Sequence, residues 1–346
     1  MKKRTKVFVS TLLTLAILGG AAAIGVSCYG KTYERAADTA CTILQITDVH
    51  LLNDEKKDAK ALKTIRAMVE TTKPDLIVVT GDVTSEKENF TAFKTFGSFM
   101  ESFAIPWAFT FGNHEGLDIA YGENEGPDGD TIADKQTLSD YLESLPHCIY
   151  ERGDPSVDGM GNYTHMVRDE TGKALMALVF MDSHSYYPDE AVGGYDCFHP
   201  NQIAWYEETI KTLARQENGD ESIPVPSLAF FHVPMREFAA GYDTGERVWG
   251  RRLETEGASF VDDEMFETMA ALGSTKGVFV GHDHMNNYTV NYQGIQLSYG
   301  LSCDHNIYVV PFRGGNLINI KEDGSFTTQA LIRHRGQSGI TVCKER

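Results

Sequence analysis

Short apolar runs alternate with amphipathic segments along the chain from residue 42 onward. The runs at 42–47, 76–80 and 107–111 are almost continuously apolar, which is typical of strands buried on both faces. The segments at 58–72 and 86–102 instead place apolar residues at helical spacing. This alternation of strands and helices predicts a parallel sheet whose strands all end at the same edge.

Shorter elements follow in the rest of the chain. Helices are predicted at 134–145, 201–215 and 262–272, and a hairpin at 162–168 and 173–181. Further strands are predicted at 228–231, 277–280, 288–292, 295–299, 307–311, 316–320 and 325–331. Three loops are expected to border a ligand site, at 116–130, 186–200 and 241–257.

The first 28 residues have the pattern of a targeting segment. Four basic residues precede an apolar stretch from Val7 to Val26, which is long enough to span a bilayer. A signal peptide or an N-terminal membrane anchor is therefore predicted at 1–28, with Cys28 as a possible lipoprotein site. The positive flank predicts that the remaining chain is exported, either secreted or anchored at the extracytoplasmic face. After this segment we expect a linker, one domain and a tail, at 29–40, 41–335 and 336–346.

Composition narrows the choice of partners. A hydrophobic fraction of 42% indicates a globular protein, and the formal net charge is −18. Such an acidic chain is not expected to bind nucleic acid, and membrane contact is expected only through the N-terminal segment. A phosphate site in this chain would need local positive charge, which bound metal ions can supply.

Metal-ligand chemistry follows five of the apolar runs at the point where each run ends. The residues are Asp48, His50, Asp82, Asn113, His232, His282 and His284. Because ligands collect at the carboxyl ends of parallel strands, these side chains are expected to converge. A mixture of carboxylate, imidazole and amide ligands suits Mn, Fe or Zn better than Ca. Seven ligands exceed the need of one ion, so two transition metal ions are predicted.

The order of these motifs resembles the calcineurin-like metallophosphoesterase superfamily. Its blocks Asp-x-His, Gly-Asp, Gly-Asn-His-Asp/Glu, a lone His and Gly-His-x-His occur in that order between about residues 42 and 331. The segments 231–234 and 281–286, and Asp182-Ser183 with Gln202-x-x-Trp205, are most similar to the branch related to purple acid phosphatases of the yeast Dcr2 and plant type. The resemblance implies an α/β fold, a four-layer α-β-β-α sandwich of two mixed sheets flanked by helices.

The resemblance also implies roles for individual residues. One metal would be held by Asp48, His50, Asp82 and His284, and the other by Asp82, Asn113, His232 and His282, with Asp82 bridging. Asn113 and His114 would contact the phosphoryl group, and His114 would act as the catalytic group that assists the leaving group. His184 is a further candidate for substrate contact from the rim. The purple enzymes carry a tyrosine ligand shortly after the Gly-Asp block, but residues 83–86 contain none, so the metal identity stays open.

The implied activity is hydrolysis of a small-molecule or protein phosphoester by a water molecule that the two metals activate. A phosphomonoesterase is favoured, and a phosphodiesterase or nucleotidase on the same site is the alternative. A metal-binding interaction scaffold on the same fold is a third interpretation. That scaffold would be expected to have a degraded site, whereas His114 and all the ligand positions are present here.

Overall fold

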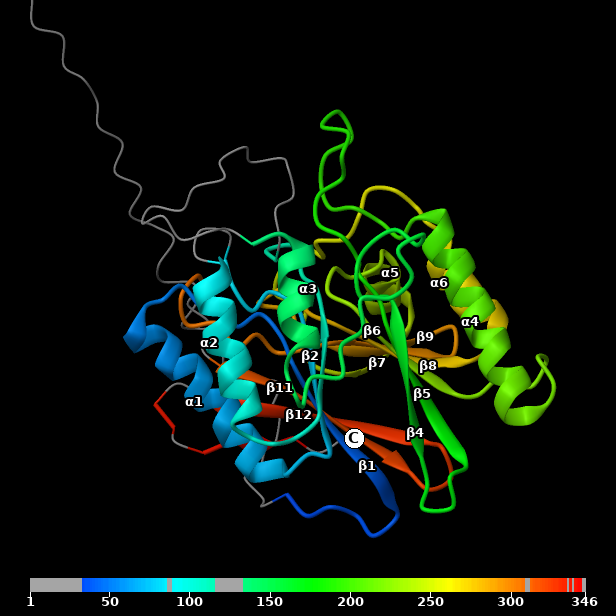
Figure 1. Cartoon of the computed structure of the whole chain (residues 1–346), viewed down its shortest axis with the longest axis horizontal. Coiled ribbons are helices and arrows are strands. Elements are labelled where there is room, and N and C mark those ends of the chain that lie inside the picture. Colours follow the sequence, from blue (N-terminus) through cyan, green and yellow to red (C-terminus); the bar gives the residue numbers. More distant parts are fainter. Residues whose placement is uncertain are drawn as a thin grey trace, which may run out of the picture.

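The computed structural model describes residues 33–85, 89–115, 133–308, 312–334, 336–337 and 339–343 (Figure 1). The targeting segment predicted at 1–28 and the loop predicted at 116–130 lie outside these ranges. Within the ranges, no helix combines the length and the apolar character needed to cross a membrane.

The first of two sheets contains six strands in the described part of the chain, in the order β13-β12-β11-β1-β2-β3. Their bounds are β1 (Thr39–Ile46), β2 (Leu76–Thr80), β3 (Trp107–Thr110), β11 (Phe312–Lys321), β12 (Phe326–His334) and β13 (Thr341–Val342). Strands β1, β2 and β3 are parallel, as their apolar sequences predict, and β11 runs antiparallel to β1. The carboxyl ends of β1, β2 and β3 therefore lie together at one edge.

The second sheet has seven strands among the described residues, in the order β4-β5-β6-β8-β10-β9-β7. They are β4 (Tyr163–Arg168), β5 (Ala174–Phe180), β6 (Ser227–Phe230), β7 (Glu246–Trp249), β8 (Thr275–Val280), β9 (Thr289–Tyr292) and β10 (Ile295–Tyr299). Its central strands β5, β6, β8 and β10 are parallel, and the outer pairs are antiparallel. Both sheets are therefore mixed.

Helices cover the outer faces of both sheets. They are α1 (Glu55–Thr72), α2 (Asn89–Glu101), α3 (Lys135–Glu143), α4 (Pro200–Asn218), α5 (Glu237–Thr244) and α6 (Met265–Leu272). In Figure 1, α1, α2 and α3 lie on the side of the first sheet, and α4 and α6 lie on the side of the second. The predicted four-layer α-β-β-α sandwich of two mixed sheets is confirmed.

An aromatic row crosses the second sheet and faces the first. Tyr163, Phe180, Phe230 and Phe279 occupy paired positions on β4, β5, β6 and β8. Their stacked rings are separated by 4.6, 5.4 and 5.3 Å between centroids. Because successive side chains of a strand point to opposite faces, the neighbouring Val278 packs on the helical side instead. The row thus fills the core between the sheets, beneath the strand ends that carry the site.

Two predictions about local structure are wrong. Residues 307–311 were expected to form a strand, but Ile307 and Tyr308 lie in a loop, because their N–H groups bind the carboxylate of Asp304 instead of a neighbouring strand. The loop expected at 241–257 contains the end of α5 and strand β7. Elements as short as β7 give too little periodicity to be recognised from sequence.

Both flanks of the predicted domain contribute to the first sheet. β1 begins at Thr39, and Tyr33 donates a hydrogen bond from its hydroxyl to Oδ1 of Asn319 at 2.8 Å. At the other end, β13 pairs with β12. The sheet therefore extends beyond the range 41–335 on both sides.

We expect Phe230→Ala to lower the free energy of unfolding by about 3–5 kcal/mol, because it removes a fully buried ring from the middle of the aromatic row. Denaturant unfolding followed by tryptophan fluorescence measures the change. Ile223→Ala is the control, since that side chain is 55% exposed and should change the free energy by less than about 0.5 kcal/mol. Equal stability of the two variants would contradict the role given to the row.

Candidate metal centre

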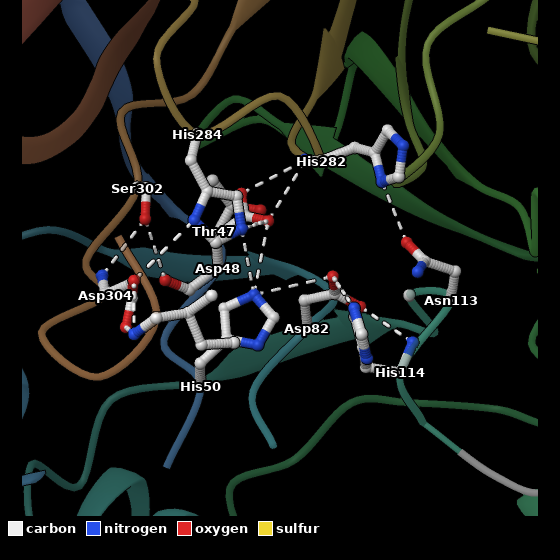
Figure 2. A network of polar contacts seen from close by, with 12 residues as sticks. Thr47, Asp48, His50, Asp82, Asn113, His114, His282, His284, Ser302 and Asp304 are labelled. Atoms are coloured by element: carbon white, nitrogen blue, oxygen red, sulfur yellow. Dashed lines mark hydrogen bonds and ion pairs between the residues drawn. The ribbon is translucent and has the colours of Figure 1, made fainter. Parts of the chain in front are cut away.

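The seven predicted metal ligands lie on loops that directly follow five strands. Asp48 and His50 follow β1, Asp82 follows β2, and Asn113 follows β3 in the first sheet. From the second sheet, the loop after β6 carries His232 and the loop after β8 carries His282 and His284. Figure 2 shows most of these side chains directed toward one another. The two sheets thus bring together residues separated by more than 200 positions in the sequence.

The backbone turns sharply at four of these residues. Asp48, His50, Asp82 and His282 have positive φ angles of 50°, 47°, 51° and 76°. This left-handed region is strained for residues with a side chain and persists only where the surroundings hold it. Here hydrogen bonds between loops provide that support: the N–H of His50 donates to the carbonyl of Asp82 at 3.0 Å, and the N–H of His282 donates to the carboxylate of Asp48 at 3.1 Å.

The glycines beside the candidate ligands allow the loops to approach closely. A Cβ atom at Gly81 would lie 2.9 Å from Nδ1 of His232, and one at Gly281 would lie 2.7 Å from Oδ2 of Asp48. A Cβ atom at Gly112 would collide with the carboxylate of Asp82. The glycines of the three motifs are therefore required by packing around the site.

The first group of candidate ligands consists of Asp48, His50, Asp82 and His284. One ligand atom from each lies within 4.8 Å of those of the others. Nε2 of His50 and Nε2 of His284 are 3.0 Å apart, and Nε2 of His284 lies 3.4 Å from Oδ1 of Asp48. Nε2 of His50 also lies 3.6 Å from Oδ2 of Asp82. Nitrogen and oxygen atoms at these separations can share one metal ion.

The second group shares Asp82 and adds Asn113, His232 and His282. Nδ1 of His232 donates to the carbonyl of Thr80 at 2.7 Å, so its Nε2 carries a lone pair when the ring is neutral. That Nε2 lies 3.0 Å from Oδ2 of Asp82 and 3.1 Å from Oδ1 of Asn113, which are both acceptors. The same Asn113 oxygen lies 2.8 Å from Nδ1 of His282. Acceptors that converge in this way need a cation between them, so the residues fit a second metal ion.

Burial and the two neighbouring carboxylates shift the pKa values of the candidate histidine ligands. Burial lowers the pKa of His50 to about 4 and that of His282 to about 3, so both rings are neutral near pH 7 and offer lone pairs. Burial acts in the same direction on His232 and His284, but the carboxylates of Asp82 and Asp48 outweigh it. They raise the pKa of His232 to about 9 and that of His284 to about 10. These carboxylates favour a cation, either a proton on the ring or a metal ion in its place.

Sequence comparison assigns the chain to a known family. Residues 41–286 match the family model described as calcineurin-like phosphoesterase. The chain belongs to the calcineurin-like phosphoesterase family. The predicted resemblance is thereby confirmed.

Relatives of this phosphoesterase family member include plant and yeast proteins similar to purple acid phosphatases. Probable inactive purple acid phosphatase 29 of Arabidopsis thaliana is 30% identical over 296 residues, which cover 77% of this chain and 72% of the relative. Phosphatase DCR2 of Saccharomyces cerevisiae is 26% identical over 280 residues, or 71% of this chain and 44% of the relative. The predicted likeness to the plant and Dcr2 branch is therefore confirmed.

A solved structure supports the fold of this family member. The dimetal phosphatase from Danio rerio aligns with a TM-score of 0.58 and 13% sequence identity. The match covers 89% of this chain and the whole of that structure. Membership of the family, together with the two overlapping groups of candidate ligands, supports a centre of two metal ions.

His114 lies beside both groups rather than within either. Its backbone N–H donates to Oδ1 of Asp82 at 3.0 Å, and its Nε2 lies 3.9 Å from Oδ2 of the same carboxylate. Its side chain is 27% exposed, whereas that of Asp82 is 2% exposed. The position is open to a substrate, while the catalytic role of His114 stays a prediction.

His184, the other candidate for substrate contact, belongs to a separate polar cluster. Its Nε2 lies 2.7 Å from Oε1 of Gln202, and its ring stacks on His199 at 4.3 Å. Gln202 donates to the carbonyl of Asp182 at 2.8 Å, and Lys135 pairs with the Asp182 carboxylate at 2.9 Å. These contacts give His184 a structural environment between α4 and the loop after β5.

Glu115 and Asp304 support the centre, and the sequence did not indicate either role. Glu115 is buried, and its carboxylate accepts N–H bonds from Asp82, Val83, Thr84 and Gly112, which ties the loop after β2 to the loop after β3. Burial and the charge of Asp82 raise the pKa of Glu115 to about 7. In the sequence Glu115 is only the last residue of the Gly-Asn-His-Asp/Glu block, and no pattern singles out Asp304.

The carboxylate of Asp304 lies within ion-pair distance of the His284 ring. Its Oδ2 lies 3.7 Å from Nδ1 of His284 (Figure 2), and it accepts the N–H of Tyr308 at 2.6 Å. Burial opposes ionisation, but His284 and the backbone N–H donors lower the pKa of Asp304 to about 2. A carboxylate behind a metal-ligating histidine holds the ring in place and makes it a better ligand.

We expect Asp304→Asn to weaken metal affinity about 10- to 100-fold, because His284 loses its charged partner. Titration calorimetry with Mn²⁺ or Zn²⁺ measures the affinity. Asp323→Asn is the matched control, since Asp323 also accepts a backbone N–H bond, from Ser325 at 2.9 Å, but lies in an exposed turn. Unchanged affinity in the Asp304 variant would refute its supporting role.

Proposed function

We propose that this protein hydrolyses phosphate esters at a centre of two metal ions, with monoesters favoured over diesters. One observation carries the proposal: the ligand atoms of both groups converge on the shared carboxylate of Asp82, with the exposed His114 beside it. When bound, the metal ions would supply charge neutralisation at the phosphoryl oxygens and a lower pKa of a water molecule.

The residues of the chain would position the ester and move a proton. Asn113 and His114 are adjacent, and their loop is fixed by Glu115 and by the hydroxyl of Ser185, which donates to the carbonyl of Asn113 at 2.9 Å. His114 would donate a proton to the oxygen of the leaving group, which general acid catalysis by histidine requires. The buried ring of His232 would keep its Nδ1 proton, hydrogen-bonded to the carbonyl of Thr80, during the reaction.

A role as a non-catalytic scaffold is the alternative from a different class. The names of the plant relatives include the words "probable inactive", which describe those proteins. In this chain the candidate ligands and His114 are present and lie close together, which favours hydrolysis. The metals are proposed to be Mn, Fe or Zn, and the exported location expected from residues 1–28 stays a prediction.

Removal and replacement of metal gives the first test. We expect full-length protein stripped with a chelator to lose hydrolysis of p-nitrophenyl phosphate, and to regain it with Mn, Fe or Zn at two ions per chain. Bis-p-nitrophenyl phosphate assayed in parallel separates a monoesterase from a diesterase. Two bound ions without turnover of either ester would favour the scaffold, and the absence of specific metal binding would contradict both interpretations.

The variant His114→Ala separates proton transfer from metal binding. We expect kcat to fall about 10²- to 10⁴-fold, because the leaving group loses its proton donor, while metal content stays at the level of the unaltered protein. Metal analysis and steady-state kinetics measure the two effects. His165→Ala is the control, an exposed histidine on β4 that should leave both unchanged. A loss of metal in the His114 variant would instead make that residue a ligand.

A further inference from the structure

The open side of the metal centre lies where its histidines reach the surface. Among the candidate ligands and His114, only His114, His282 and His284 are partly exposed, and the His114 side chain, at 27%, is more exposed than that of His284, at 6%. A substrate must therefore approach over these three residues. The chemistry of the neighbouring side chains decides which leaving group can be accommodated.

Two tyrosines flank this side, one for each half of the centre. The ring of Tyr195 meets His282 edge to face at 4.1 Å between centroids, and the ring of Tyr308 lies over His284 at 4.4 Å. Tyr195 is half-buried and stacks on Tyr186 at 5.5 Å, while Tyr308 is 43% exposed. Because the two histidines belong to different ligand groups, one tyrosine lies beside each group.

Further apolar side chains are exposed on the loops that border the metal centre; these loops, with Tyr195 and Tyr308, are called the rim. The exposed large hydrophobic residues of the described chain are Val192, Ile223, Leu253, Phe260, Ile307 and Tyr308. All but Ile223 belong to three loops, at 182–199, 250–262 and 303–308. One residue of each loop lies against a candidate ligand: Tyr195 and Gly257 against His282, and Asp304 against His284. Phe260, which is 71% exposed, packs against Gly194 beside Tyr195. Exposed apolar groups gathered around a site are typical of a binding surface.

Charge near the rim disfavours a polyanionic leaving group. Arg252 pairs with Glu256 and with Asp243 at 3.1 Å, so its positive charge is already neutralised by carboxylates. Glu254 accepts the N–H of Met285 at 2.6 Å, which places a carboxylate next to His284. With a net charge of −18, the chain repels substrates that carry several phosphates.

We propose that Tyr195 and Tyr308 form the walls of a leaving-group subsite that selects phosphate esters of aromatic or apolar, uncharged alcohols. This inference rests on the proposed function, since it assumes that the phosphoryl group binds at the metal centre. An aromatic leaving group would pack against the two rings, whereas a polyphosphate would meet the carboxylate of Glu254 and the negative charge of the chain.

Binding of two inert phosphonates tests the subsite without any chemical step. We expect benzylphosphonate to bind the Mn²⁺-loaded full-length protein at least about 10-fold more tightly than methylphosphonate, as measured by calorimetry. The ratio of the two dissociation constants is the readout, because incomplete metal loading changes the stoichiometry and leaves the ratio intact. Equal affinities would overturn the proposal.

Variants of the two tyrosines test whether they cause the preference for benzylphosphonate over methylphosphonate. We expect Tyr195→Ala and Tyr308→Ala each to reduce the ratio about 3- to 10-fold, and the Tyr→Phe variants to keep most of it, since the ring provides the contact. Tyr292→Ala is the matched control. This tyrosine is also half-buried against an aromatic ring, that of Phe266 at 5.5 Å, but it lies where the end of β9 pairs with the start of β10, at the opposite end of β10 from the metal centre. A ratio unchanged in both alanine variants would assign the preference elsewhere and overturn the proposal.

Hydrolysis assays distinguish failure of this inference from failure of the proposed function. Turnover of esters with no benzyl preference in binding would overturn the subsite and leave the phosphoesterase in place. A benzyl preference that the tyrosine variants abolish, in a protein that hydrolyses no ester, would support the subsite and refute the hydrolytic function.

Discussion

The peptide unit and the carboxylate of Asp82 connect the loops from which the metal centre is built. The carbonyl of Asp82 accepts N–H bonds from Val49 and His50, and its amide donates to Glu115. Its carboxylate lies 3.0 Å from Nε2 of His232. One residue therefore joins the segments that follow three strands of the first sheet to a segment that follows β6 in the second. Through these contacts Asp82 holds the loops that carry His50 and His232.

The same residue also determines the electrostatics of the site. Asp48 and Asp82 are each 1% exposed, and buried carboxylates are unfavourable unless positive charge lies beside them. Burial opposes the ionisation of Asp82, but His232 and His114 outweigh it and lower its pKa. The centre is therefore arranged to hold cations. Its supporting loops accept backbone strain at Asp48, His50, Asp82 and His282, which the hydrogen bonds between loops keep in place.

The side chains that surround the metal centre come from a different part of the fold than the candidate ligands. Its ligands come from strand ends, which the core of the sandwich positions rigidly, whereas the rim comes from loops between elements. Those loops are anchored individually: Asp283 accepts the N–H of Gly257 at 3.0 Å and the hydroxyl of Tyr299 at 2.6 Å, and Asp304 binds the N–H groups of its own loop. Chemistry common to a family and selectivity particular to one chain thus come from separate parts of the molecule.

The sequence by itself determined the family and most of the strands, and it predicted the metal-ligand positions. Short continuous apolar runs alternating with helical segments favour buried parallel strands, and residues such as Asp48 and Asp82 follow those runs directly in the chain, so their place at a strand end could be predicted without the fold. Only the tertiary structure decided which residues support or border the centre. Asp304 lies beside His284, the ring of Tyr195 meets that of His282 edge to face, and His184 contacts Gln202. These contacts join loops without a local periodic pattern, and their geometry is set by the packing of two sheets that are distant in sequence.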